Sequence, residues 1–175
     1  MNNKQQCIAL FWAVALALYA ACWFLPTIDS DVGYQSAGRA HLMFVILFES
    51  PPPIVDQPVT LFITVFYAIG WMANELFVLG IVTVWKWPKF AVRSLAFSLG
   101  IMIAWQIGLA AAFPFLIGYW LWVAAGSTTL WLSAERLARQ KKSVVLSVFT
   151  DKVTLALLLF PIVNATVGVT LDAMK

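Results

Sequence analysis

The sequence predicts an all-α integral membrane protein, a small helical bundle of four or five transmembrane helices. Hydrophobic residues make up 62% of the chain and charged residues only 11%, whereas a typical soluble domain has about 45–50% and about 25%. The apolar residues also form long stretches of about 20 residues, the length that crosses a bilayer. A β-barrel would instead need short segments of alternating polarity. We therefore expect residues 1–175 to form one polytopic membrane domain.

The first predicted span covers residues 7–25. Lys4 precedes it, and Pro26 ends it because proline has no N–H to continue a helix. Its YAAC sequence, which ends at Cys22, resembles the end of a bacterial lipoprotein signal. However, Tyr19 stands where that pattern usually has leucine, and apolar residues continue beyond the cysteine. We expect a retained anchor helix, with cleavage and lipidation at Cys22 as the alternative.

The longest polar interval, residues 26–58, is the predicted outer loop. Within it, residues 41–48 are apolar but too short to span, so we expect a short interfacial or re-entrant helix. The loop also holds the candidates for chemistry outside the bilayer, either acid–base work or binding of a divalent cation. These candidates are Asp29, Asp31, Arg39, His41 and Glu49. No known catalytic spacing accompanies them, so a solvated face that sets topology is the competing interpretation.

The remaining predicted spans are residues 59–85, 94–112, 117–134 and 153–171. The last contains Pro161, which is tolerated in membrane helices, so this segment is expected either to cross the bilayer or to form a re-entrant element.

Lysine and arginine gather in two short segments between predicted spans, residues 86–93 and 135–142. The positive-inside rule places both segments and the N-terminus in the cytoplasm and the acidic loop outside. A bacterial inner membrane is the expected location, because the chain is small and its predicted loops are short. The net charge of +3 is small and lies mainly at these loops, so nucleic-acid binding is not expected.

Polar residues recur near the middle of four predicted spans. They are Asn74, Glu75, Gln106, Ser127, Thr128 and Asn164. Glu75 precedes Lys86 by eleven residues, which places it about 16 Å from the cytoplasmic edge at about 1.5 Å per residue. An ionisable group at this depth is costly, so we expect Glu75 to be protonated and to face the bundle interior. The polar residues either fix helix packing through hydrogen bonds or form a proton or cation path.

Metal and redox cofactors are not expected. Cys7 and Cys22 lie on one predicted helix about 22 Å apart, too far for a disulfide. Neither belongs to a cysteine–histidine cluster, and the chain has one histidine.

Three functions remain open besides contact with the lipid bilayer itself. The first is a non-enzymatic accessory, assembly or immunity-type protein that binds a membrane-protein partner or further copies of itself. The second is a small oligomeric channel or transporter that uses Glu75. The third is a membrane enzyme that acts on lipid at the outer surface.

Overall fold

The computed structural model describes residues 3–28, 31–33, 35, 38, 45, 72–109, 116–140 and 151–174. Within this part of the chain, five helices and one two-stranded antiparallel sheet are present. The elements are α1 (Asn3–Cys22), β1 (Pro26–Ile28), β2 (Asp31–Val32), α4 (Met72–Thr83), α5 (Pro88–Leu109), α6 (Ile117–Gln140) and α8 (Lys152–Ala173). The predicted helical class is confirmed, while the number of membrane spans stays a prediction.

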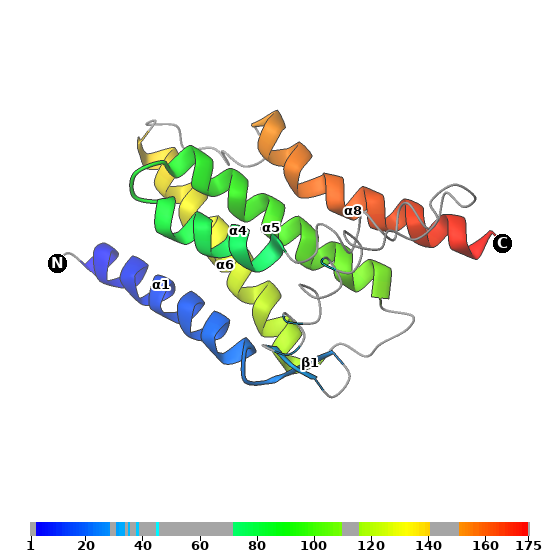
Figure 1. Cartoon of the computed structure of the whole chain (residues 1–175). Helices are drawn as coiled ribbons and strands as arrows, with labels where there is room; N and C mark the ends of the chain where they lie inside the picture. The colour runs from blue at the N-terminus through cyan, green and yellow to red at the C-terminus, as the bar shows by residue number, and fades with distance from the viewer. Residues whose placement is uncertain are drawn as a thin grey trace.

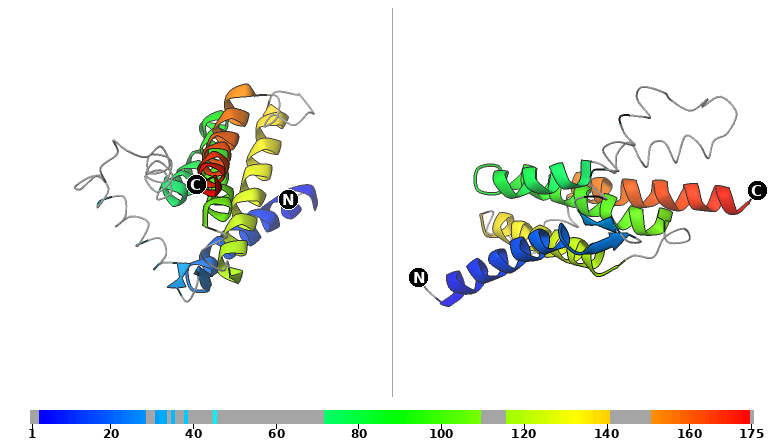
Figure 2. Two further views of the ribbon diagram at one scale, coloured as in Figure 1. Left: turned by 90° about the vertical axis from the view of Figure 1, so that its right-hand side faces the viewer. Right: turned by 60° about the horizontal axis from the view of Figure 1, so that its bottom comes forward.

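Helix α5 lies at the centre and packs against α4, α6 and α8, whereas α1 packs against α6 (Figure 1). Figure 2 (right) shows two layers, with α4, α5 and α8 in one and α6 and α1 in the other. Three small residues of α5, Ala96, Ser98 and Gly100, are buried and let neighbouring helices approach closely. The sequence therefore places small residues where the most crowded helix needs them.

The helices alternate in direction, so the basic residues of the described helices gather at one end of the bundle (Figure 1). At this end the Trp12 and Trp85 rings lie 6.4 Å apart, and the Arg136 guanidinium lies 3.8 Å from the Trp85 ring centroid. We call this region the basic end, defined by Lys86, Lys89, Arg93, Arg136, Arg139 and Lys152. The described residues of the two basic segments thus lie on the same side of the bundle. Their assignment to the cytoplasm stays a prediction.

Several helix boundaries differ from the predicted ones. Helix α5 begins at Pro88, so most of the predicted loop 86–93 is helical. Proline is favourable in a first helical turn because its missing N–H has no helical partner there anyway. Helix α6 continues to Gln140, and an ion pair between Glu135 and Arg139 supports this extra length. Charged residues end an apolar stretch without ending the helix.

The other three spans also differ in their ends. Helix α1 stops at Cys22, before the predicted end at residue 25. The predicted span 59–85 is described as helix only over Met72–Thr83. Helix α8 continues through the buried Pro161.

Two of the described helices are long and apolar enough to cross a membrane, by length and composition alone. They are Pro88–Gly108, with mean hydropathy 1.5, and Lys152–Thr170, with mean hydropathy 2.0. The first is largely buried by its neighbours, whereas only 17% of the second is buried. Helix α8 therefore presents most of its apolar surface to the surroundings.

The outer surface of the helices is rich in large apolar side chains. Exposed examples are Leu10, Phe11, Val14 and Leu16 on α1, Val78, Leu79 and Val82 on α4, and Leu159, Phe160, Val163, Val167 and Val169 on α8. The interior includes small and hydroxyl-bearing residues, such as Ser94, Ser98 and Thr129. Most buried residues are nevertheless apolar, as in a water-soluble domain, so the distinguishing feature is the set of large apolar side chains on the outside.

A short hairpin follows α1, in the predicted outer loop. Pro26 pairs with Val32, and Ile28 pairs with Asp31. The Gly33 N–H donates to the carbonyl of Leu25, between α1 and β1, at 3.2 Å. A Cβ atom at Gly33 would lie 2.1 Å from the Cys22 carbonyl oxygen, so this close approach requires glycine.

Candidate functional site

Serine hydroxyls join α5 to α4. Ser94 donates to the Leu76 carbonyl at 2.8 Å, and Ser98 donates to the Ala73 carbonyl at 2.6 Å. The two serines are four residues apart, so they lie on one face of α5. Their spacing of four residues is the sequence signal for this contact, although the two serines were not among the predicted polar residues.

Replacing Ser98 by alanine is expected to lower stability by about 0.6 kcal/mol, and by no more than about 2 kcal/mol. The variant loses an interhelical hydrogen bond at a buried site. Thermal unfolding in mild detergent measures this loss. Ser127→Ala is the control, because the exposed Ser127 donates to Val123 of its own helix at 2.9 Å. Equal losses in the two variants would contradict an interhelical role for Ser98.

Asn74 and Glu75 lie side by side in the sequence but have different surroundings. Asn74 is half-buried, and its Oδ1 accepts a hydrogen bond from the Tyr19 hydroxyl of α1 at 3.3 Å. Tyr19 also stacks on Phe77, with ring centroids 4.2 Å apart. Glu75 is exposed, on a different face of α4 from the buried Ala73 and Phe77. The expectation that Glu75 faces the bundle interior therefore differs from the structure.

Gln106, Thr128 and Asn164 are half-buried, on α5, α6 and α8 respectively. The Nδ2 atom of Asn164 is buried, and the described residues give it no hydrogen-bond partner. One buried cluster contains Ala73, Trp105 and Ala165. These residues are next in the sequence to Asn74, Gln106 and Asn164. Asn74, Gln106 and Asn164 thus lie at a similar level of the bundle. The described hydrogen bonds join Asn74 to Tyr19 and not to the other two.

Most of the predicted outer-loop candidates lie outside the described residues. These are Asp29, Arg39, His41 and Glu49, together with most of the predicted helix 41–48. Asp31 is described only as part of strand β2. Among the residues that the structure describes, no group of three His, Cys, Asp or Glu side chains is placed to hold a metal ion. Cys7 and Cys22 are both free thiols.

The exposed residues of α4 form one continuous face. We call it the α4 stripe, defined by Glu75, Val78, Leu79 and Val82. Spacings of three, four and seven residues place these side chains in a line along one side of the helix. Val82 is 64% exposed, and Val78 is 47% exposed. The stripe thus combines a carboxyl group with aliphatic side chains in the pattern of a helix–helix contact.

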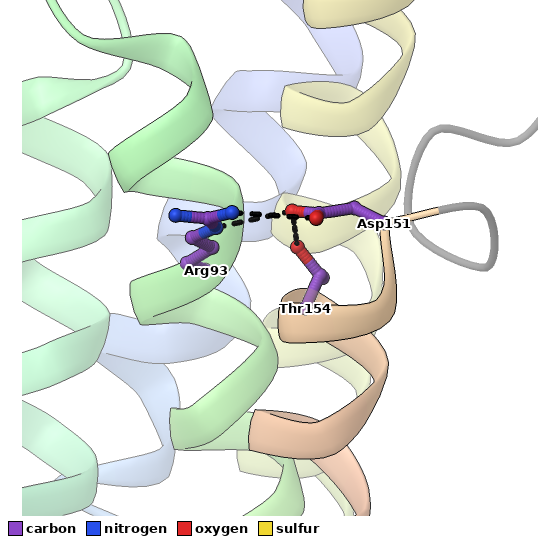
Figure 3. Close-up of polar contacts among 3 residues, drawn as sticks. All are labelled: Arg93, Asp151 and Thr154. Atoms are coloured by element: carbon purple, nitrogen blue, oxygen red, sulfur yellow. Dashed lines mark hydrogen bonds and ion pairs between the residues drawn. The ribbon is translucent and has the colours of Figure 1, made fainter.

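At the basic end, a polar contact joins α5 to the start of α8 (Figure 3). Arg93 donates to Asp151 through Nε at 3.0 Å and through a terminal guanidinium nitrogen at 3.3 Å. The Thr154 hydroxyl donates to the same carboxylate at 2.7 Å. The hydrogen bonds from Arg93, and then that from Thr154, lower the pKa of Asp151 from 3.8 to about 2. Asp151 is thus held as a carboxylate over the ordinary pH range.

No family model, curated protein or solved structure matches this chain.

Proposed function

We propose that this chain is a polytopic protein of the bacterial inner membrane that acts by binding another membrane protein through the α4 stripe. The observation that carries the proposal is Glu75, an ionisable side chain exposed among aliphatic side chains on α4.

The distribution of side chains supports insertion into lipid. Large apolar groups cover the outside of α1, α4 and α8. Large exposed apolar surfaces mark sites of contact with a membrane or with another protein. Inside the bundle, apolar packing is accompanied by a close approach at Gly100 and by hydrogen bonds from Ser94 and Ser98. Membrane helices associate through such contacts, because lipid provides no hydrophobic drive between them.

The level of Glu75 follows from its neighbours on α5. Ser98 lies at the midpoint of the 22-residue helix α5 and bonds to the Ala73 carbonyl of α4. Glu75 is two residues from Ala73, about 3 Å along the helix axis. If α5 spans the bilayer, Glu75 lies close to its middle.

An exposed ionisable group at this depth is unfavourable, by about 2.5–3.5 kcal/mol on insertion scales for charged side chains. A partner helix with a lysine, arginine or amide at the same depth would remove this cost through a hydrogen bond or ion pair. Val78, Leu79 and Val82 would supply the packing along the same contact. We therefore propose that the α4 stripe binds a transmembrane helix of a different protein, and that this helix carries such a donor.

Photo-cross-linking in native membranes tests this assignment. A photoreactive residue at Val78 is expected to give one defined adduct with another membrane protein, whereas the same residue at the exposed Val163 of α8 is not. Glu75→Ala is expected to reduce the Val78 adduct about tenfold, which corresponds to about 1.4 kcal/mol. The adduct is expected to return when Glu75→Lys is combined with a glutamate in place of the partner's donor residue.

Three outcomes would contradict the proposal. They are an adduct that does not depend on Glu75, an adduct with a second copy of this chain, and a cross-link within the chain itself. Resistance to extraction with alkaline carbonate tests membrane insertion separately. The channel and lipid-enzyme hypotheses stay predictions, because the described residues favour neither.

A further inference from the structure

A hollow of about 710 Å³ lies at the corner between α4 and α5, at the basic end. Its lining includes Leu79, Lys86, Trp87, Lys89, Phe90 and Arg93. We call it the corner hollow. It combines apolar and basic side chains, and no acidic side chain is among its lining residues.

Two of its three cations have no acidic hydrogen-bond or ion-pair partner among the described residues. Lys86 and Lys89 are exposed, and the Lys86 ammonium lies 5.1 Å from the centroid of the neighbouring Trp87 ring. Arg93 is different, because it is already paired with Asp151. Lys89 is also near enough to Asp151 to help lower the pKa of that carboxyl, but Arg93 is the ion-pair partner. The three cations therefore outnumber this one acid and leave a local positive charge that an anion would neutralise.

A smaller hollow at the same end provides a contrast. It has a volume of about 340 Å³ and is lined by Trp12, Trp85, Glu135, Arg136 and Arg139, among others. Here the lining includes an acid, Glu135, which pairs with Arg139, while Arg136 lies over the Trp85 ring. The corner hollow differs because no acidic side chain is among its lining residues.

The aromatic lining limits the chemistry of the anion. Trp87 is 57% exposed and Phe90 is 48% exposed, directly beside the lysines. Aromatic side chains at the end of a membrane helix lie at the headgroup level, and basic pockets at the cytoplasmic side bind anionic lipid headgroups. An amphipathic ligand would meet both surfaces, whereas a free inorganic anion would use only the lysines.

We propose that the corner hollow binds an anionic phospholipid, with Lys86 and Lys89 on its phosphate and Trp87 and Phe90 against its glycerol and upper acyl chain. This inference rests on the membrane insertion proposed above but not on the α4 stripe. Each lysine contributes about fivefold to lipid affinity, the equivalent of about 1 kcal/mol near a membrane surface.

Native mass spectrometry of the full chain, released from nanodiscs of mixed phosphatidylcholine and phosphatidylglycerol, measures which lipid stays bound. The wild type is expected to retain phosphatidylglycerol preferentially. Lys86→Gln and Lys89→Gln are each expected to reduce this preference about fivefold, and the double variant more. Arg139→Gln, which removes one positive charge at the same end, is expected to leave it unchanged. Circular dichroism confirms that the variants fold alike.

Each contrary outcome has a separate meaning. Full lipid preference in the double lysine variant overturns the inference, as does an equal loss in Arg139→Gln, which would indicate a diffuse positive surface. Displacement of the lipid by millimolar inorganic phosphate identifies a simple anion site instead. A chain that inserts but shows no lipid preference overturns this inference alone. A chain that does not insert overturns the proposed membrane function as well.

Discussion

Gly100→Ala is expected to destabilise the protein by about 1–3 kcal/mol, the usual range for overpacking a tight interior. A Cβ atom at this position would lie 2.3 Å from the Leu158 carbonyl oxygen of α8. That atom belongs to the backbone of a helix, so it moves only if α5 and α8 separate. The change is expected to act on the most extensive helix contact of the described bundle.

Gly126→Ala is the matched control for this prediction. A Cβ atom there would meet the Met102 sulfur at 2.9 Å, and a methionine side chain adapts its shape readily. Alanine favours a helix over glycine by about 0.8–1 kcal/mol at either site, so the difference between the two variants isolates the contact with α8. Thermal unfolding in mild detergent measures both. Equal stabilities would show that α8 does not pack on Gly100 as the structure has it.

The helical class could be predicted from the sequence, because composition and the length of the apolar stretches are counted directly from it. Gly80, Gly100 and Gly126 each lie against a neighbouring helix, as small residues commonly do in membrane helices. The predicted positions of the helix ends were less accurate. Hydropathy marks where apolar residues stop, but α5 and α6 also include charged residues such as Lys89 and Arg139, whose side chains are exposed.

The direction in which Glu75 points was not predictable from its depth. Both faces of α4 are apolar, so the hydrophobic pattern does not select the inward one. The inward face is marked instead by Ala73 and Gly80, seven residues apart, which are small enough to fit against α5. The cost of exposing an ionisable group to lipid predicts that Glu75 points inward. In the structure, the packing of α4 against α5 turns it outward instead. Because Glu75 points outward, we place it in a surface that binds a partner and not in an interior polar cluster.

The contact between Arg93 and Asp151 spans 58 positions of the chain, so no local pattern reveals it. Each residue begins or nearly begins a helix, and the two helices run parallel from the basic end (Figure 1). Charge at helix ends was interpreted as a topology signal alone. In the structure it also joins two helices.

Asp151→Ala is the second change expected to have a large effect, with a loss of about 1–3 kcal/mol. Asp151 occupies the N-cap of α8, where its carbonyl accepts the N–H of Leu155 at 3.0 Å. Loss of an N-cap side chain costs about 0.5–2 kcal/mol, and loss of a partly exposed ion pair adds up to about 1 kcal/mol. Asp151→Asn keeps a good capping residue and is expected to lose only the smaller part. If the two variants are equally unstable, the ion pair and not the cap carries the effect.

Acid provides an independent test of the same carboxylate. Its folded pKa of about 2 lies below the ordinary value of 3.8, so its contribution to stability is fully present above the ordinary value. That contribution is lost as the pH falls from about 4 towards about 2, because the unfolded chain takes up the proton first. Unfolding curves across this range are expected to converge for wild type and Asp151→Asn, since both then carry an uncharged group opposite Arg93. Curves that stay a constant distance apart down to the lowest pH would mean that Arg93 does not hold the charge of Asp151. The link between α5 and α8 would then depend on packing, such as that at Gly100 and Ala165.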